Sequence, residues 1–301
     1  MRTVRNSAFV ASVMAAIVVS AMATVATADD VACAFTADTE GRIWPGGCCG
    51  DKNEIGCLPR RATVLAAMRK GAKDLLVLEA GNFLFGPDSL DSKGQAMVVA
   101  YNALGYDVAN ISYRDFRLGK SQTLETLKEA KFVPVSANLL DAQSGRLLFK
   151  PYVVKEAAGK KTAILGLTEL VPGVARLPHM ARQLEGVTAR PPADALTEWL
   201  PKAKAESGQV IVLYYGSLEG LKTIRDKAGA DVAAIFVGGM RPDELPTAGK
   251  PPVAAAHEFG RQIAKVLLGS AKIDVTQEPV NANVAIDEPT KKLLLPYARE
   301  P

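Results

Sequence analysis

Histidine is scarce in this chain: His179 and His257 are the only two among 301 residues. Any metal site that requires three or more histidine ligands is therefore excluded. The sequence also lacks the short motifs G-x-x-x-x-G-K-[ST], G-x-G-x-x-G, G-x-S-x-G, C-x-x-C-H and H-E-x-x-H. Their absence argues against P-loop, dinucleotide-binding, serine-hydrolase, c-type haem and zincin chemistry. For both histidines, an ordinary surface or hydrogen-bonded role is favoured over metal ligation.

A strong charge bias is lacking as well. The formal net charge is +4, and two of the positive charges, Arg2 and Arg5, belong to the extreme N-terminus. No stripe of lysine and arginine runs through the rest of the chain, so nucleic-acid binding has no electrostatic support. Hydrophobic residues make up 48% of the chain, which is enough for the core of one large domain.

The N-terminus has the pattern of a secretion signal. Arg2 and Arg5 precede an uninterrupted apolar run over 8–25, and Ala26-Thr27-Ala28 is an A-x-A cleavage sequence. A retained membrane anchor is the alternative, because the uncharged stretch approaches the length that spans a bilayer. The small residues at its end favour cleavage. We therefore expect residues 1–28 to be a signal peptide and residues 29–301 to form a single periplasmic or secreted domain without membrane attachment.

All four cysteines lie between positions 33 and 57. In an oxidising compartment they suggest disulfides, and Cys57 closes more easily with Cys48 or Cys49 than those two neighbours close with each other. One interpretation is a redox-active or soft-metal site formed by Cys48, Cys49 and Cys57. The other is a structural disulfide that staples a glycine-rich loop, with Cys33 buried elsewhere.

Short apolar runs alternate with amphipathic segments along the chain, which predicts an α/β fold. The segment 171–192 is rich in proline and arginine and is expected to be an irregular surface excursion. The consecutive strands of the last third are expected to make a second sheet partly antiparallel. Helices are predicted at 58–70, 93–104, 120–130, 193–207 and 218–228, and strands at 31–35, 74–80, 108–112, 132–137, 147–155, 161–167, 209–215, 231–237, 253–257 and 273–286.

The best candidate site begins at the end of the first predicted strand. Asp38 and Glu40 follow that strand two positions apart. In extended backbone, side chains two apart lie on the same face, so the two carboxylates are expected to converge. The cysteine-rich loop follows directly, before the helix predicted at 58–70.

Three segments of the chain resemble the bacterial periplasmic 5′-nucleotidase / UDP-sugar hydrolase family. They read V-S-A-N-L at 135–139, S-G-R-L-L-F-K-P-Y at 144–152 and A-I-L-G-L-T at 163–168. The resemblance covers essentially the whole chain after the signal. It implies the calcineurin-like metallophosphoesterase fold, a sandwich of two mixed sheets flanked by helices. Members of this family hold two metal ions that activate a water.

At the positions of the family's metal ligands, this sequence departs from the pattern, and every histidine is replaced. The resemblance implies Asp38, Glu40 and Asn82 as remnant metal-ligand positions. It implies Arg114 and Asp115 as the counterpart of the catalytic asparagine-histidine motif. The replacements are Asp38-Thr39-Glu40 for D-x-H, Gly81-Asn82 for G-D, Ser112-Tyr113-Arg114-Asp115 for G-N-H-E, Tyr214 or Tyr215 for a later histidine, and 238–242 for G-G-H-x-H.

Arg114 falls where the family has a catalytic histidine beside the metals. An arginine fork can pair with a carboxylate and substitute for a missing cation. We therefore hypothesise that Arg114 bridges Asp38 or Glu40. The alternative is a solvated loop charge.

These departures favour an exported protein of the metallophosphoesterase fold that does not hydrolyse phosphate esters by the family's mechanism. The expected role is that of a binding or accessory protein in the periplasm, and a redox role of the cysteines is a further possibility that the sequence leaves open. Expected partners are a small phosphorylated ligand or a periplasmic protein. The alternative is a hydrolase that uses one hard cation such as Mg²⁺ or Mn²⁺ on the oxygens of Asp38, Glu40, Asn82 and Asp115. A divalent metal ion, Mn²⁺, Mg²⁺ or Zn²⁺, is the one cofactor that stays open. A purely structural or partner-docking protein is a third reading.

Overall fold

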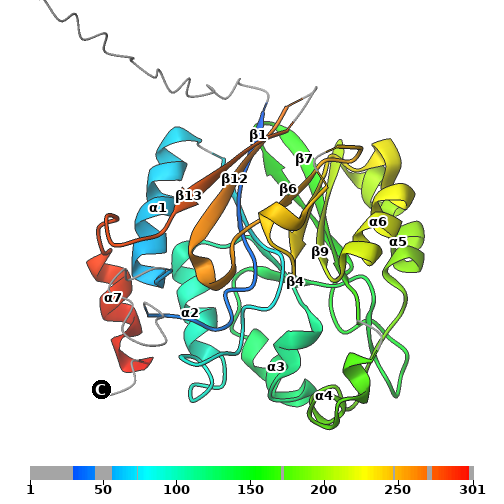
Figure 1. Ribbon diagram of the computed structural model, residues 1–301, viewed down its shortest axis with the longest axis horizontal. Helices are drawn as coiled ribbons and strands as arrows, with labels where there is room; N and C mark the ends of the chain where they lie inside the picture. The colour runs from blue at the N-terminus through cyan, green and yellow to red at the C-terminus, as the bar shows by residue number, and fades with distance from the viewer. Residues whose placement is uncertain are drawn as a thin grey trace, which may run out of the picture.

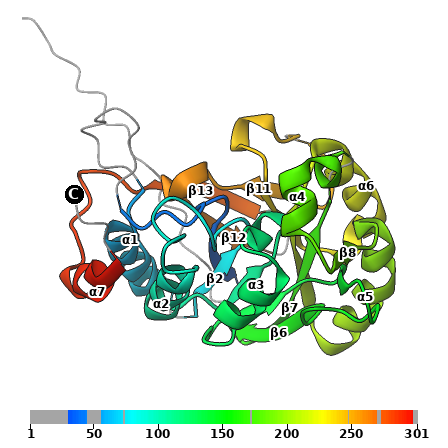
Figure 2. The same cartoon turned by 90° about the horizontal axis from the view of Figure 1, so that it is seen from below.

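Two β-sheets face each other between two groups of helices (Figures 1 and 2). The computed structural model describes residues 30–44, 56–72, 74–170, 173–246, 248–269 and 273–297. The predicted α/β fold with mixed sheets flanked by helices is confirmed. The expected signal peptide, as well as Cys48 and Cys49, lies outside the described residues.

The first sheet has β1, the first strand of the chain, near its centre. Its strand order is β13-β12-β1-β2-β3-β4, in which β1 to β4 are parallel and β12 and β13 are antiparallel. The carboxyl ends of the parallel strands therefore meet at one edge of the sheet. The strands are β1 (Val31–Thr36), β2 (Leu76–Glu79), β3 (Val108–Asn110), β4 (Val133–Val135), β12 (Gln262–Leu268) and β13 (Ile273–Pro279).

The second sheet has the order β11-β10-β9-β7-β6. Its strands are parallel except for β6, which pairs antiparallel with β7. A separate two-stranded ribbon joins β5 to β8. The bounds are β5 (Leu139–Asp141), β6 (Tyr152–Ala157), β7 (Lys160–Thr168), β8 (Val187–Ala189), β9 (Gln209–Tyr215), β10 (Ala234–Gly238) and β11 (Val253–Ala255).

Helices cover the outer face of each sheet. Figure 2 shows α1, α2 and α7 on one side of the sandwich and α5 and α6 on the other. The shorter α3 and α4 lie together at one end of the sandwich (Figure 1). The bounds are α1 (Leu58–Gly71), α2 (Gln95–Leu104), α3 (Lys120–Leu127), α4 (Pro178–Gln183), α5 (Pro192–Glu206), α6 (Leu218–Ala228) and α7 (Glu288–Leu294).

The core consists of three apolar clusters, one at each interface between layers. Alternate residues of strand β1 belong to two of these clusters. Cys33 and Phe35 face the second sheet, whereas Ala32 and Ala34 face the helices on the outer side. This alternation follows from the two-residue period of a strand. Between the sheets, the ring of Phe35 stacks on Phe236 of β10 with centroids 4.5 Å apart.

Several sequence predictions are corrected by the structure. The segment 171–192 is not wholly irregular, because it contains α4 and β8. The strand expected at 273–286 ends at Pro279. Strand β12 and helix α7 were not predicted. Strands β12 and β13 belong to the first sheet, not to the second sheet as expected. The antiparallel pairing of β12 with β1 joins residues more than 200 positions apart in the chain.

No helix in the described part of the chain has both the length and the hydrophobicity needed to cross a bilayer.

Candidate functional site

The segments that follow β1 and β2 remain hydrogen-bonded to each other beyond the sheet. The backbone N–H of Asp38 donates to the carbonyl of Gly81 at 3.0 Å, and that of Glu40 donates to the carbonyl of Asn82 at 2.9 Å. Asp38, Glu40 and Asn82 all have left-handed backbone, with φ of 49°, 49° and 63°. Such backbone is uncommon outside glycine and is concentrated at functional sites.

The expected convergence of Asp38 and Glu40 is present, although the backbone that produces it is not extended. Both side chains line the same cavity. The Asn82 amide lies between them and donates to Asp38 Oδ1 at 2.8 Å and towards Glu40 Oε1 at 3.5 Å. The prediction that the two carboxylates converge assumed extended backbone. They converge instead in backbone with a left-handed φ at Asp38, Glu40 and Asn82.

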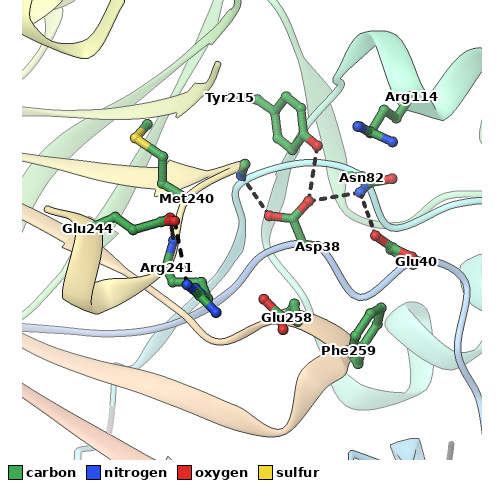
Figure 3. Close-up of a pocket in the computed structure, with 11 residues that line it drawn as sticks. Asp38, Glu40, Asn82, Arg114, Tyr215, Met240, Arg241, Glu244, Glu258 and Phe259 are labelled. Atoms are coloured by element: carbon green, nitrogen blue, oxygen red, sulfur yellow. Dashed lines mark hydrogen bonds and ion pairs between the residues drawn. The ribbon is translucent and has the colours of Figure 1, made fainter. Parts of the chain in front are cut away.

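Asp38 is the most heavily hydrogen-bonded side chain of the site (Figure 3). Besides Asn82, the Tyr215 hydroxyl donates to Oδ1 at 3.0 Å, and the Gly239 backbone N–H donates to Oδ2 at 2.6 Å. Burial raises the pKa of the Asp38 carboxyl, and these three donors oppose that rise. Both oxygens of Asp38 therefore face protein donors.

The two tyrosines that the sequence left as alternatives are separated by the period of β9. Tyr214 faces the outer helices, where its hydroxyl donates to Glu169 at 2.7 Å. Tyr215 points into the cavity and reaches Asp38. Of the two, Tyr215 is thus the one that belongs to the site.

Glu40 lies beside Asp38 and is less buried. Burial raises the pKa of its carboxyl, and the charge of Asp38 raises it further, whereas the charges of Arg114 and Arg42 oppose the rise. The two carboxylates therefore disfavour each other's ionisation.

The hypothesised Arg114 bridge is not formed. Within the described residues, the Arg114 guanidinium makes no ion pair with Asp38 or Glu40, and it lies over the ring of Tyr113 at 5.6 Å from the centroid. Its side chain still lines the cavity (Figure 3). Arg114 consequently acts on the two carboxylates through space rather than by direct pairing.

Asp115 lies beneath the cavity rather than in it. Its carboxylate is fully buried and accepts from the backbone N–H groups of Asn82, Phe83 and Leu84 and from the backbone and hydroxyl of Ser112. These contacts hold the loop that presents Asn82. The structure therefore gives Asp115 a positioning geometry, not one in contact with a ligand.

The cavity at these strand ends has a volume of about 370 Å³. The sequence did not predict the wall formed by Glu244, Glu258 and Phe259, because these residues lie in two short 3₁₀ turns far along the chain, Pro242–Glu244 and Glu258–Gly260. Phe259 has a φ of 61°, and its backbone N–H donates to the Asp38 carbonyl at 2.8 Å. The lining residues are Asp38, Glu40, Asn82, Arg114, Tyr215, Gly239, Met240, Arg241, Glu244, Glu258 and Phe259.

A buried polar network lies behind the site. Glu79, at the end of β2, accepts from the Thr36 hydroxyl and from the Tyr101 hydroxyl, both at 2.7 Å, and from the Gly81 N–H at 3.1 Å. The fully buried Arg61 guanidinium contacts the hydroxyls of Tyr101 and Tyr106. Burial is the main cause that raises the pKa of the Glu79 carboxyl to about 7.

The residues present do not fit a dinuclear metal site of the type that the resemblance implies. Across the described ranges, no three His, Cys, Asp or Glu side chains gather in a group able to hold a metal ion. Asn82 directs its N–H donors at the carboxylates, and Tyr215 and Gly239 direct donors at Asp38. Donors thus occupy both oxygens of Asp38, which would have to face a metal.

The two cysteines in the described residues, Cys33 and Cys57, lie in different parts of the fold. Cys33 is buried between the sheets, where burial raises the pKa of its thiol. Cys57 is buried at the N-terminus of α1 and does not line the cavity. Since Cys48 and Cys49 are outside the described residues, the predicted site of Cys48, Cys49 and Cys57 stays a prediction.

Comparison with solved structures identifies the fold as that of the calcineurin-like metallophosphoesterases. The calcineurin-like phosphoesterase YfkN from Bacillus subtilis superposes with a TM-score of 0.70 at 19% identity, over 89% of this chain and 96% of that one. A 5′-nucleotidase precursor from Thermus thermophilus gives a TM-score of 0.71 at 23% identity, over 89% of this chain and 58% of that one.

Curated proteins with similar sequences are nucleotidases and cyclic-nucleotide phosphodiesterases. A Yersinia enterocolitica protein named 2′,3′-cyclic-nucleotide 2′-phosphodiesterase/3′-nucleotidase is 26% identical over 52% of this chain and 26% of its own length. Snake venom 5′-nucleotidase from Gloydius brevicauda is 26% identical over 73% of this chain and 39% of its own length. Sequence and fold together confirm the resemblance to the 5′-nucleotidase/UshA metallophosphoesterase family.

No protein-family model matches the chain. The chain spans about a quarter to two fifths of the length of these curated relatives.

Proposed function

We propose that this protein binds a small ligand in the strand-end cavity and does not hydrolyse phosphate esters by the two-metal mechanism. The observation that carries the proposal is the set of donors around Asp38. An amide, a phenol and a backbone N–H occupy the oxygens of this carboxylate. They stabilise its ionised form by hydrogen bonding and take up lone pairs on both oxygens that bridging two cations would need.

The alternative is a hydrolase that uses one hard cation. The side chains of Asp38, Glu40 and Asn82 all carry oxygens, and they lie together at the strand ends. Oxygen ligands of this kind suit Mg²⁺ or Mn²⁺. Rotating the Asn82 amide would be required, because its nitrogen now faces the two carboxylates. The kinship with metal-dependent phosphoesterases favours keeping this second candidate.

Elemental analysis and activity assays separate the two candidates. Protein purified from an oxidising compartment without added metal or chelator should contain well under one equivalent of Mn, Zn or Fe. It should also leave a nucleoside monophosphate and bis(p-nitrophenyl) phosphate intact in Mg²⁺ or Mn²⁺. About two equivalents of metal together with metal-dependent turnover would contradict the proposal that the protein does not hydrolyse phosphate esters. Turnover with one equivalent would favour the alternative.

Export to the periplasm or beyond is part of the proposal, and it depends on the N-terminal pattern of Arg2, Arg5 and Ala26-Thr27-Ala28. A disulfide between Cys57 and either Cys48 or Cys49 is compatible with that compartment. Mass spectrometry of the exported protein tests both points. Cleavage after Ala28 and one disulfide are expected, whereas an intact N-terminus with four reduced thiols would contradict them.

A further inference from the structure

A second cavity, of about 230 Å³, adjoins the first. Glu40, Asn82 and Arg114 line both cavities and therefore lie at the boundary between them. The remaining wall comes from the segments after β2 and β3 and from α4, a helix that the sequence did not predict. The residues on this wall are Phe85, Arg117, His179, Met180 and Gln183.

Basic side chains dominate the second cavity. Arg114, Arg117 and His179 line it, and Glu40 is its one acidic lining residue. Within the described ranges, none of the three basic side chains forms an ion pair with a carboxylate of the protein. The opposite wall of the first cavity differs, because the Arg241 guanidinium there lies 3.7 Å from both Asp243 and Glu244.

The guanidinium groups of Arg114 and Arg117 line the cavity without a direct ion pair to any described residue, so their N–H donors are available to an anionic ligand. The ring N–H of His179 adds a further donor. An arginine fork matches the spacing of the oxygens on a phosphate or sulfate group, and such charge-assisted hydrogen bonds are stronger than neutral ones. Gln183 adds an amide that can donate at the same wall, whereas Phe85 and Met180 supply apolar surface.

We propose that the second cavity binds a tetrahedral oxyanion, a phosphate or sulfate group, directly on Arg114, Arg117 and His179 without a metal ion. This inference deepens the proposed function by naming the class of ligand. Ligand cavities commonly span about 300–1,000 Å³. The second cavity is smaller, so it holds the anionic head, and the rest of an ester extends past Asn82 into the first cavity beside Tyr215 and Phe259.

The test is titration calorimetry of the purified full chain with inorganic phosphate in excess EDTA. Arg117→Gln removes a cation from the cavity. Arg182→Gln is the matched control, because Arg182 is also an exposed arginine of this region, on α4, but does not line the cavity. We expect R117Q to weaken phosphate binding about tenfold or more and R182Q to change it less than about threefold. Both substitutions are at exposed positions, so melting temperatures should stay close to that of the wild type.

Three results would overturn the inference: no phosphate binding in EDTA, binding that requires a divalent cation, or equal losses in R117Q and R182Q. None of them decides the proposed lack of hydrolysis, which the turnover assay measures separately. Parallel titrations with sulfate and phenyl phosphate identify the source of the anion. Tighter binding of phenyl phosphate supports an ester whose body occupies the first cavity, and equal affinities support the free anion.

Discussion

The side-chain amide nitrogen of Asn82 lies 2.8 Å from Asp38 Oδ1, and the two residues share an uncommon left-handed backbone. Asn82 stands where the family's pattern has an aspartate. In this protein, a neutral donor therefore faces Asp38 where a third carboxylate would require a cation. The Asn82 amide thus avoids the repulsion that a third carboxylate beside Asp38 and Glu40 would create.

Asn82→Asp should reverse this relationship. The change is nearly isosteric, but it removes the donor and puts a third carboxylate beside Asp38 and Glu40. We expect the melting temperature in EDTA to fall by several degrees, corresponding to about 1 kcal/mol or more, and Mn²⁺ to raise it again by binding the folded state. Differential scanning fluorimetry with and without Mn²⁺ measures both effects.

Asn283→Asp provides the control for that experiment, because it makes the same chemical change at an exposed position. It should leave the melting temperature and the response to Mn²⁺ unchanged. If N82D behaved like N283D, the Asn82 amide would not be what balances the carboxylates.

Tyr215→Phe and Tyr214→Phe should have different effects on Asp38. The Tyr215 hydroxyl donates to Asp38 and lowers the pKa of its carboxyl, whereas the Tyr214 hydroxyl donates to Glu169 on the opposite face of β9. Each variant loses one hydrogen bond and about 1 kcal/mol of stability. We expect the pKa of Asp38 to rise in Y215F because a donor to its ionised form is removed, and to stay constant in Y214F.

Carboxyl ¹³C NMR titration follows Asp38 directly in both variants. Equal pKa values for Asp38 in Y215F and the wild type would show that Tyr215 does not stabilise the ionised carboxylate.

Glu79 should make stability depend on pH. Burial raises the pKa of its carboxyl from 4.5 to about 7 in the folded protein. Between these values the folded state keeps a proton that the unfolded chain has released, so the free energy of unfolding falls as the pH rises. At about 1.4 kcal/mol for each pH unit, the loss from pH 4.5 to 7 is on the order of 3 kcal/mol.

Comparison with Glu79→Gln isolates this contribution, because glutamine cannot titrate. Urea unfolding at several pH values should show the stability of the wild type falling relative to E79Q up to about pH 7 and running parallel above it. Curves that are parallel throughout would contradict the raised pKa of Glu79.

Gly86→Ala should disrupt the loop that carries Glu40. A Cβ at position 86 would lie 1.5 Å from the carbonyl oxygen of Glu40, and backbone cannot move away as a side chain could. We expect a loss of about 3 kcal/mol or more in the free energy of unfolding.

Gly208→Ala is the control for the glycine experiment. A Cβ there would meet only the carbonyl oxygen of Lys161, at an ordinary 3.7 Å. It should be neutral or slightly stabilising, because alanine restricts the unfolded chain. Similar stabilities for G86A and G208A in denaturant would mean that the loop can relax around position 86.

The fold could be predicted in large part from local patterns. Short apolar runs identified β1 and β9, and the segments at 135–168 indicated the resemblance to the family. The pairing of β12 with β1 was not predicted, because it joins Val31 to Leu268 and no local pattern reports a contact of that range. Helix α4 was missed for a related reason: it has six residues and begins at a proline within a stretch that reads as loop.

The sequence by itself determined which chemical groups are available. It has two histidines in the whole chain, Asp38, Glu40 and Asn82 at the family's ligand positions, and Arg114 at the position of its catalytic histidine. Only the tertiary structure decided how they are used. It directs Tyr215 rather than Tyr214 at Asp38, buries Asp115 beneath the loop of Asn82 and leaves Arg114 unpaired with the carboxylates. The physical reason is separation along the chain: the Gly239 N–H that completes the shell of Asp38 lies 201 residues away, and only the packing of one sheet on the other brings it there.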